Sequence, residues 1–505
     1  MLANNLPALI VTVPLLAGLV TPFTRRGSVA WVWATLITGC VFAMCMGLAH
    51  QVLGMSEPLH YPMGSWQPPF GIEYRVDAFN AFVLLIISGI GFIATVGSRL
   101  TVAKEISDDR QHFFYAVWLL CITGLMGMTI TGDCFNIYVL LEIASLSSYA
   151  LIAMGKDRDR RALSATINYV ILGTIGASFI LIGIGYLYMV TGTLNVEDMA
   201  SRIRDLRLRW DAGDMTYHRT VVVAFGFLLA GFAMKMALFP VHGWLPNAYT
   251  YAPSAVSTLL PATGTKVGAY VALRFMYTVV GPELSFLRFS AGPVLVTCGA
   301  GAVIVGSYCA IRQTNAKRLL AYSSVGQVGY LAIGMGLYDK VALQGTIIHL
   351  FNHAIIKGGL FMALAAVAYR LGGTNLSQMR GLGRRMPLTM AAFVVGGLGL
   401  IGMPLTAGFV SKWYLVNGAM NAGSWAAVAV VMGGSLLAVM YVWRVVEVAY
   451  FQPAPDDGID VKEAPLALLI PTWILVGATL WFGVDANLTS RVSEAAVRAL
   501  TGSGS

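Results

Sequence analysis

Long apolar runs, each close to the length needed to cross a bilayer, recur along the whole chain. A helix needs about 20 predominantly apolar residues to span the hydrocarbon core. The pattern predicts about fourteen transmembrane helices, near residues 6–23, 29–53, 78–98, 113–131, 135–154, 165–190, 219–239, 254–279, 289–311, 319–337, 341–369, 387–420, 424–450 and 464–483. The predicted fold class is therefore an all-α polytopic membrane protein.

Two of the predicted helices contain a proline in mid-run. Pro240 should break the seventh helix and Pro404 the twelfth, because proline removes a backbone hydrogen bond and clashes with the preceding turn. Broken helices at equivalent places in two sets of helices are typical of transporters built from inverted repeats. Helices 4–8 and 9–13 fit this arrangement, since each set has an odd number of crossings and the second therefore begins on the opposite side of the membrane.

This symmetry divides the chain into four parts. Residues 1–111 hold helices 1–3, residues 112–280 form the first five-helix repeat, residues 281–451 form the second, and residues 452–505 hold helix 14 and the tail. The division rests on the pattern of helices and breaks, because no direct identity between the two halves is visible in the sequence.

The charge distribution supports a membrane location and predicts an orientation. Of all residues 57% are hydrophobic and 11% are charged, against about 25% charged in soluble domains. The net charge of +9 therefore does not indicate nucleic-acid binding. Most cations fall in connections on one side, which predicts that this side is cytoplasmic and that both termini lie on the outer side of a bacterial-type inner membrane. These cations are Arg25, Arg26, Lys104, Arg110, Lys156, Arg158, Arg160, Arg161, Lys317, Arg318, Arg380, Arg384 and Arg385.

The long connection 191–218 interrupts this charge pattern, because it carries arginines on the opposite side. Its apolar residues Met199, Ile203 and Leu206 recur at helical spacing. An amphipathic segment of this kind predicts a short helix that lies at the membrane interface.

The sequence predicts neither a cofactor nor a metal site. The six cysteines have no CxxC spacing, which argues against an iron–sulfur cluster, a structural zinc ion or a disulfide framework. A Walker motif is also missing from the sequence, so the chain alone is not expected to hydrolyse ATP. We therefore expect no catalytic redox site of its own.

Ionisable residues within the predicted helices are candidates for an ion path, because a charge at membrane depth costs about 3 kcal/mol or more. Lys235 and Lys266 flank the first break, Glu142 lies in mid-helix, and Lys412 follows the second break. Burial disfavours a charged lysine and a nearby carboxylate favours it. Glu142 paired with a lysine at a variable distance could therefore take up and release a proton. The alternative is a neutral Glu142 bonded to nearby hydroxyls.

Three more candidates share one predicted helix, in the run His349-Leu-Phe-Asn-His353-Ala-Ile-Ile-Lys357. Residues four apart lie on one helix face, about 6 Å from one step to the next, which suits a relay bridged by water. The alternative is a zinc site, because His-x-x-x-His is metal-ligand spacing, but Leu350 replaces the glutamate of the usual motif. His242, in the first break, either joins this relay or satisfies free backbone carbonyls.

Several of these motifs together resemble a known family. Glu142 in a Phe-Asn-x-Tyr-Val-x-x-Glu context, Lys235 ahead of Phe-Pro-Val-His-Gly-Trp-Leu-Pro, and the runs around Lys266, His349 and Lys412 are similar to the antiporter-like subunits shared by respiratory complex I and Mrp cation/proton antiporters. In size the chain is most similar to the Mrp D subunit. The resemblance implies a fourteen-helix fold with broken helices 7 and 12 and outward termini. It also implies a central hydrophilic axis through Glu142, Lys235, Lys266, His349, His353, Lys357 and Lys412.

The leading hypothesis for function is a proton-translocating subunit of a multi-subunit Mrp-type Na⁺/H⁺ antiporter. The alternative is the same kind of subunit in a redox-driven complex, such as a complex I-like NADH-quinone oxidoreductase or a membrane-bound hydrogenase, where it would act as a translocase. The expected partners are other membrane subunits, protons, Na⁺ and the lipid bilayer, and no nucleic acid. A stand-alone transporter of organic solutes is disfavoured, because no run of selective side chains suggests a substrate cavity.

Overall fold

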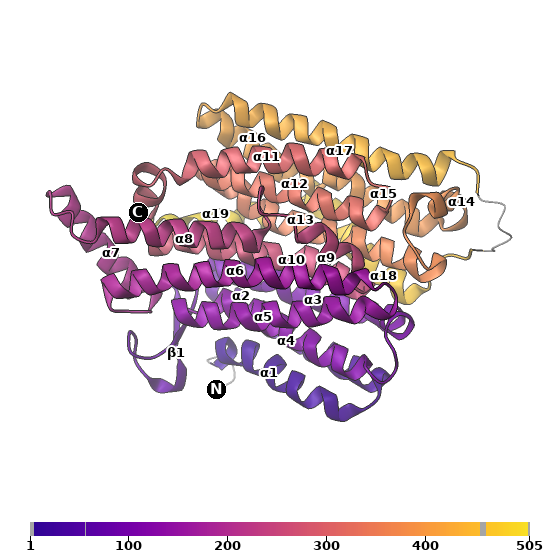
Figure 1. The fold of residues 1–505 in the computed structure, drawn as a ribbon, viewed down its shortest axis with the longest axis horizontal. Coiled ribbons are helices and arrows are strands. Elements are labelled where there is room, and N and C mark those ends of the chain that lie inside the picture. The colour runs from indigo at the N-terminus through magenta and orange to yellow at the C-terminus, as the bar shows by residue number, and fades with distance from the viewer. Residues whose placement is uncertain (1–4, 56, 455–460, 503–505) are drawn as a thin grey trace.

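Roughly parallel helices form most of the molecule in the computed structural model, which describes residues 5–55, 57–454 and 461–502 (Figure 1). The helices are α1 (Leu6–Val20), α2 (Gly27–Leu53), α3 (Ala78–Glu105), α4 (Gln111–Ile130), α5 (Cys134–Ala153), α6 (Arg161–Thr191), α7 (Val196–Asp211), α8 (His218–Met236), α9 (Leu245–Tyr251), α10 (Ser254–Leu273), α11 (Ala291–Ile311), α12 (Ala316–Gly336), α13 (Lys340–Leu371), α14 (Leu382–Arg385), α15 (Pro387–Ile401), α16 (Ala407–Asn421), α17 (Trp425–Phe451), α18 (Leu466–Val484) and α19 (Asn487–Thr501). Strands β1 (Leu59–Pro62) and β2 (Glu73–Val76) pair as an antiparallel hairpin.

Each of the predicted membrane spans corresponds to helix in the structure. Within the described residues, 11 helices are long and apolar enough to cross a membrane. The remaining predicted spans are α10 and α12, which are more polar, and the pair α15 and α16, which are 15 residues each. The chain is thus an all-helical, multi-pass integral membrane protein.

Both predicted breaks are present. Helix α8 ends at Met236, where Ala237 takes a left-handed conformation (φ 57°), and α9 begins only at Leu245, beyond Pro240. Helix α15 ends at Ile401, where Gly402 is left-handed (φ 86°), and α16 begins at Ala407, beyond Pro404. A left-handed residue after the last turn, followed by proline, is a common way to end a helix.

Helix α13 lies at the centre of the bundle and carries the predicted His349–Lys357 stripe. It packs against α3, α10, α12, α15, α16, α18 and α19. From Gly345 to Ala368 nearly every side chain is buried, with the partly exposed Phe351 as the exception. The polar side chains of α13 therefore face other helices and not lipid.

Two similar backbone clasps join connections that are distant in sequence. Asp133, which caps α5, forms an isolated bridge with Asn195 at the end of the α6 connection. Asn315, which caps α12, forms the same bridge with Asn375 at the end of the α13 connection. In the first clasp the amide of Cys134 donates to Leu194 O at 2.8 Å, and the amide of Val196 donates to Gly132 O at 2.9 Å. In the second clasp the amide of Ala316 donates to Thr374 O at 2.8 Å, and the amide of Leu376 donates to Thr314 O at 2.9 Å.

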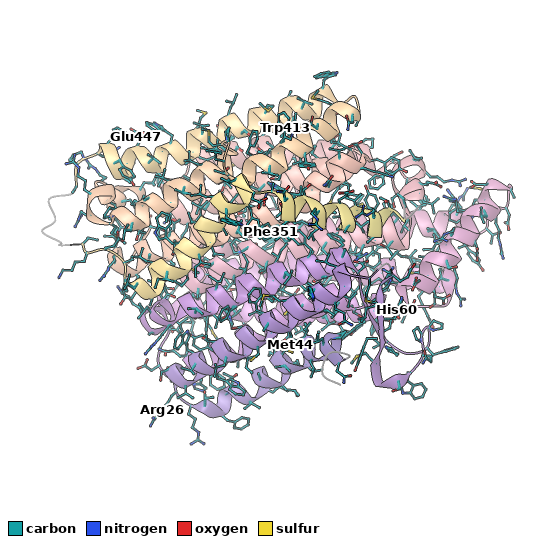
Figure 2. The ribbon with its side chains drawn as sticks, turned by 180° about the vertical axis from the view of Figure 1, so that it is seen from behind. Arg26, Met44, His60, Phe351, Trp413 and Glu447 are labelled. Atoms are coloured by element: carbon teal, nitrogen blue, oxygen red, sulfur yellow. The ribbon has the colours of Figure 1, made fainter. Side chains whose placement is uncertain are left out.

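The hairpin, α7 and α19 gather at one end of the molecule. Tyr61 of the hairpin region donates to Asn5 just before α1, at 2.8 Å, and Thr501 of α19 lines one cavity together with Arg75 of β2. Figure 2 shows His60 of β1 at the end opposite to Arg26. The beginning of α1 and the end of α19 therefore lie at the same end, away from the arginines before α2.

The sequence prediction for the connection 191–218 is half correct. A helix, α7, is present, but Met199, Ile203 and Leu206 are buried (0%, 1% and 8% exposed) and belong to the protein core. Helix α7 packs against α6 and the π-helical turn Arg274–Val279. Its apolar face therefore contacts protein, and the predicted interfacial placement of that face is wrong.

A buried ion pair fixes the start of α3 to the end of α10. Arg274 Nη2 donates to Asp77 Oδ1 at 2.5 Å, and the two side chains are 8% and 5% exposed. Asp77 also caps α3 by accepting from the amide of Phe79 at 3.0 Å. The pair therefore joins helices from different parts of the chain.

Asp77→Ala is expected to lower the free energy of unfolding by about 3–5 kcal/mol, because it leaves a buried arginine unpaired. The measurement is thermal unfolding of the purified protein in detergent. Glu494→Ala is the control, since the Glu494–Arg498 pair is 58% and 57% exposed and should contribute less than about 1 kcal/mol. Equal stability of the two variants would refute a structural role for the buried pair.

Candidate functional site

Most of the predicted site residues are buried inside the bundle, although they come from separate helices. Lys266 of α10, the three stripe residues of α13 and Lys412 of α16 are all less than 9% exposed. Glu142 of α5, Lys235 of α8 and His242 are partly buried. The break and helix geometry place these groups within helix interfaces, where a charge is costly.

Lys235 lies in the last turn of α8 and reaches across to α5. Its Nζ donates to Ser145 Oγ at 2.9 Å. Ser145 lies one helical turn after Glu142, on the same side of α5. Lys235 therefore bonds to Ser145, on the face of α5 that also carries Glu142, and the described residues show no direct ion pair between Lys235 and Glu142. Glu142 as the partner of Lys235 remains a prediction.

A cavity of about 50 Å³ lies beside Lys235. Its polar lining comes from α5, α6, α8, α9 and α10, and consists of Ser145, Ser148, Tyr169, Lys235, Tyr249 and Thr265. One water molecule needs roughly 10–15 Å³ of such volume. The space can hold a few water molecules between Lys235 and the helix that carries Lys266.

Lys266 turns back along its own helix. Its Nζ donates to the carbonyl of Pro261 and lies 3.4 Å from Thr265 Oγ1. Thr265 also lines the cavity beside Lys235. Thr265 thus contacts Lys266 and also lines the same cavity as Lys235.

The stripe on α13 has the predicted geometry. The rings of His349 and His353 are stacked, with centroids 5.6 Å apart and an interplanar angle of 12°. Lys357 donates to Leu320 O at 2.8 Å and to Ser323 Oγ at 2.5 Å. Both ring nitrogens of His353 are buried and have no hydrogen-bond partner among the described residues. Bridging water would satisfy them, which is the arrangement that a relay requires.

The stripe meets Lys412 through α16 and α12. His349 Nδ1 is 3.0 Å from Ser411 Oγ, next to Lys412 in sequence. The ring of Tyr330 is 5.8 Å from the His349 ring and 4.8 Å from Lys412 Nζ. The structure therefore brings His349 and Lys412 into one cluster.

Lys412 caps the broken helix α15. Its Nζ donates to Leu400 O at 3.1 Å, to Ile401 O at 2.8 Å and to Ser435 Oγ at 2.9 Å. These carbonyls belong to the helix end, which carries a partial negative charge. A Cβ on Gly402 would stand 2.8 Å from the Lys412 side chain, so glycine provides both the left-handed turn and the space for the lysine.

His242 does not hold the free carbonyls of the first break in the way that Lys412 holds those of the second. Trp244 Nε1 donates to Met234 O at 3.0 Å, and backbone amides of the turn bond to Ala233 and Met234. The His242 ring packs 5.6 Å from the Phe239 ring, and its Nδ1 is buried without a hydrogen-bond partner among the described residues. Trp244 thus holds the end of α8 beside His242, and the role of His242, in a relay or as a partner of backbone carbonyls, remains a prediction.

Lys317 is a buried lysine that the sequence prediction placed in a loop. It is 4% exposed and donates to Ala252 O at 3.0 Å. The clasp at Asn315 turns the first residues of α12 inward, toward α9. The assignment of Lys317 to a connection is therefore wrong, since it lies in the first turn of α12 and is buried, whereas Arg318 beside it stays partly exposed. The sequence Lys317-Arg318 contains no signal that separates the two.

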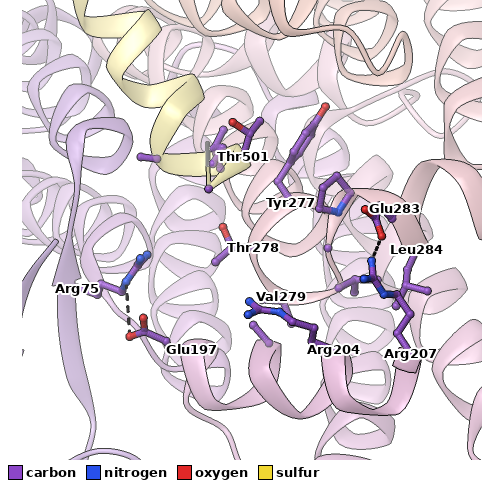
Figure 3. Close-up of a pocket in the computed structure, with 17 residues that line it drawn as sticks. Arg75, Glu197, Arg204, Arg207, Tyr277, Thr278, Val279, Glu283, Leu284 and Thr501 are labelled. Atoms are coloured by element: carbon purple, nitrogen blue, oxygen red, sulfur yellow. Dashed lines mark ion pairs between the residues drawn. The ribbon is translucent and has the colours of Figure 1, made fainter. Parts of the chain in front are cut away.

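Three cavities lie in series between Lys235 and the end of the molecule that carries the hairpin. The cavity beside Lys235 shares Met128 and Val271 with one of about 20 Å³ near Tyr270 and Arg274. That second cavity shares Arg75 and Val279 with an open one of about 330 Å³. Figure 3 shows Arg75, Glu197, Arg204 and Arg207 around this open cavity, below Tyr277 and Thr501. Met128 and Val271 therefore lie between the first two spaces, and Arg75 and Val279 lie between the second and the third.

Comparison with known sequences gives consistent matches over the whole chain. Residues 131–438 match the family described as NADH:quinone oxidoreductase/Mrp antiporter, TM. The chain is 40% identical over 520 residues to the N subunit of the NADH-quinone oxidoreductase of Desulforudis audaxviator, covering 98% of each chain. It is 30% identical over 427 residues to the D subunit of the Na⁺/H⁺ antiporter of Alkalihalophilus pseudofirmus, covering 84% of this chain and 83% of the antiporter chain.

Solved structures similar to this chain also come from both an Mrp complex and a respiratory complex. A chain of the Mrp complex from Dietzia superposes with a TM-score of 0.88 at 25% identity, covering 99% of this chain and 98% of the other. A chain of the membrane-bound sulfane sulfur reductase, an archaeal respiratory membrane complex, superposes with a TM-score of 0.87 at 30% identity, covering 98% and 97%. The fold is common to both kinds of complex.

Proposed function

Because the chain belongs to the family of membrane proteins shared by NADH:quinone oxidoreductases and Mrp antiporters, we propose that it carries protons across the membrane as one subunit of a redox-driven complex. The observation that carries the proton path is the series of lysines and histidines inside the bundle on α8, α10, α13 and α16, of which all but His353 are held by a hydroxyl or a carbonyl. Groups of this kind can pass a proton along bridging water.

The choice of a redox-driven complex reverses the order of the two hypotheses drawn from the sequence. It is supported by the 40% identity to a chain of an NADH-quinone oxidoreductase and by the 30% identity to a chain of the sulfane sulfur reductase. The Mrp-type Na⁺/H⁺ antiporter is the second candidate, favoured by the TM-score of 0.88 to a chain of an Mrp complex. The partners in either case would be other membrane subunits.

The proposed path starts at Lys235, with Glu142 as its counter-ion. It continues through the adjacent cavity to Lys266, along His353 and His349, and ends at Lys412. Lys357 joins the path as a neighbour of His353 on the same helix face. His242 would contribute as a side branch in the first break.

We also propose that the chain contains an inverted repeat and that it crosses the membrane fourteen times. The similarity of the Asp133–Asn195 and Asn315–Asn375 clasps supports residues 112–280 and 281–451 as equivalent units. The two clasps lie near opposite ends of the long helix α3. Thr131, close to the first clasp, forms a bridge with the hairpin before α3. Lys104, at the other end of α3, donates to Tyr369 O, which is close to the second clasp in sequence. The same motif on opposite sides is what an inverted repeat requires.

We propose that the hairpin end faces outward, with the loop arginines in the cytoplasm of a bacterial-type cell. The positive-inside rule supports this orientation. Both Arg26 and the Lys104–Tyr369 contact then lie on the inner side, whereas the three cavities in series connect Lys235 to the outer side.

Identification of the proteins that purify with the chain tests the proposed complex. We expect flavin-, iron–sulfur- or quinone-binding proteins in the same detergent-solubilised particle, and proton uptake into vesicles that depends on electron transfer. A particle with only small membrane proteins, together with proton movement driven by a Na⁺ gradient, would replace the redox proposal with the antiporter.

The His349 and His353 pair provides a prediction for the relay. If both rings act in one water-bridged chain, the double change His349→Ala plus His353→Ala should lower proton transfer little more than either single change, because losses within one functional unit are not additive. The measurement is the proton flux in vesicles with matched protein levels. Additive losses would argue for independent packing roles, and loss of activity with a chelator, restored by Zn²⁺ only in the protein with both histidines, would favour the metal alternative.

A further inference from the structure

His60 of β1, Glu73 of β2 and Glu197 of α7 meet at the hairpin end of the molecule, apart from the buried lysines. Within the described residues, one donor atom from each of these side chains lies within 4.8 Å of the other two. We propose that they form a binding site for a divalent transition-metal ion of the Zn²⁺ type. Imidazole and carboxylate oxygen are both ligands of zinc.

Glu73 is the fixed member of this site. Its side chain is 3% exposed, and Asn195 Nδ2 donates to its Oε1 at 2.6 Å. Asn195 is itself held in place, because its Oδ1 accepts from the amides of Glu197 and Asp198 at 3.0 Å each. A hydrogen bond that orients a ligating carboxylate is the usual support of a metal ligand. It leaves Glu73 Oε2 directed toward His60.

The charge balance at this site favours a cation. A buried carboxylate needs a positive partner, and the basic group paired with Glu73 is the His60 ring, with Nδ1 3.0 Å from Oε2. Glu197 adds a second carboxylate, 4.0 Å from His60 Nε2. Arg75 lies 4.0 Å from Glu197 and also 3.4 Å from Asp77, so it keeps a partner if Glu197 turns away.

Modest side-chain movement would complete the site. Ligand bonds to zinc are about 2.0–2.2 Å long, so donor atoms stand roughly 3–3.5 Å apart around the ion. His60 Nδ1 and Glu73 Oε2 already have this spacing. Glu197 lies 4.0 Å from the other ring nitrogen, Nε2, so its exposed side chain (58%) would rotate toward the Nδ1 side of the ring to join them. Water would supply the fourth ligand. Because Arg75 is close, we expect micromolar affinity and not the tighter binding of a closed structural site.

The position of the site gives it a consequence for transport. Glu197 and Arg75 line the open cavity of about 330 Å³, and Figure 3 shows the contact between them at its wall. An ion shared by the hairpin and α7 would tie the two elements together and take Glu197 from Arg75. If protons reach Lys235 by this cavity, as the proposed function requires, the bound ion should slow proton transfer from the outer side.

The test is titration of the full-length chain in detergent with Co²⁺, which reports its ligands by visible absorption. We expect one Co²⁺ per chain with a low-coordinate spectrum, displaced by Zn²⁺. His60→Gln, which can still donate to Glu73, should weaken binding at least about tenfold, and Glu197→Gln should do the same. His50→Ala, which removes another exposed histidine near the end of α2, is the matched control and should bind like the unchanged protein.

Three results would overturn the proposal. One is the lack of saturable Co²⁺ binding. Another is equal binding by His60→Gln and His50→Ala, which would mean adventitious binding only. The last is thiolate absorption or a sulfur shell in zinc X-ray absorption, which would assign the ion to cysteines such as the exposed Cys40. Inhibition of proton transfer by Zn²⁺ is a separate readout, so that failure of the transport proposal would leave the binding result intact.

Discussion

Lys235→Ala is expected to reduce proton transfer by at least about tenfold, which corresponds to about 1.4 kcal/mol in the barrier. Among the described residues, Lys235 is the one basic side chain that lines the cavity between α5 and α10, and its Nζ bonds to Ser145 Oγ at 2.9 Å. Alanine therefore removes from that lining the amine that would exchange the proton. The measurement is proton flux in inverted membrane vesicles.

Two further variants separate proton exchange from simple charge. Lys235→Arg keeps the positive charge but cannot release its proton, since arginine stays protonated in proteins. We expect it to be as inactive as Lys235→Ala. Lys340→Ala is the matched control, because Lys340 is exposed at the start of α13. Full activity of Lys235→Arg at normal protein levels would show that the lysine only provides charge.

The Glu142 series is expected to give the second-largest effect, with activity falling in the order unchanged protein, Glu142→Asp, Glu142→Gln. Glutamine removes the charge and keeps the shape, whereas aspartate keeps the charge and withdraws it by one methylene. Lys235 bonds to Ser145 and forms no direct ion pair with Glu142 among the described residues, so we expect Glu142 and Lys235 to be coupled through space. We expect Glu142→Gln to lower the proton flux at least about tenfold, because the carboxylate that favours the protonated lysine is missing.

A double-mutant cycle tests whether Glu142 acts through Lys235. The pair of changes Glu142→Gln and Lys235→Ala should lower proton flux no further than Lys235→Ala alone, because residues of one unit are not additive. Ser147→Ala on the same helix is a control for the packing of α5, since Ser147 is buried but does not line the cavity. Glu142→Gln with normal flux would identify Glu142 as a neutral buried acid.

The sequence was sufficient to predict the long apolar helices, both breaks and the burial of the lysines on α10, α13 and α16. These features follow from the length of apolar runs and from proline, which act locally. The spacing of His349 and His353 was equally predictable, because a helix fixes the distance between residues four apart. The observed ring separation of 5.6 Å agrees with the expected step.

Features that depend on tertiary contacts were not predicted. Helix α19 packs against α3 and α13, yet its segment is too short and too polar to be recognised by hydropathy. The α7 face was assigned to the membrane surface because amphipathic spacing does not distinguish lipid from protein as the apolar partner. Lys317 was assigned to a loop because its burial depends on where α9 lies. Ser145, which holds Lys235, gives no signal apart from the serine-rich run in which it lies.

The two asparagine clasps bear on how the chain acquires its orientation during membrane insertion. Asn195 is followed by Glu197 and Asp198 and then by Arg202, Arg204, Arg207 and Arg209 among further acids, whereas Asn375 is followed by cations alone, Arg380, Arg384 and Arg385. Cations near a helix end are retained in the cytoplasm, and acids oppose translocation little. The asparagine common to both clasps is uncharged and bonds equally well in either compartment. One folding motif can therefore serve on either side of the membrane, so the charges that set the orientation must act over the connections of the whole chain.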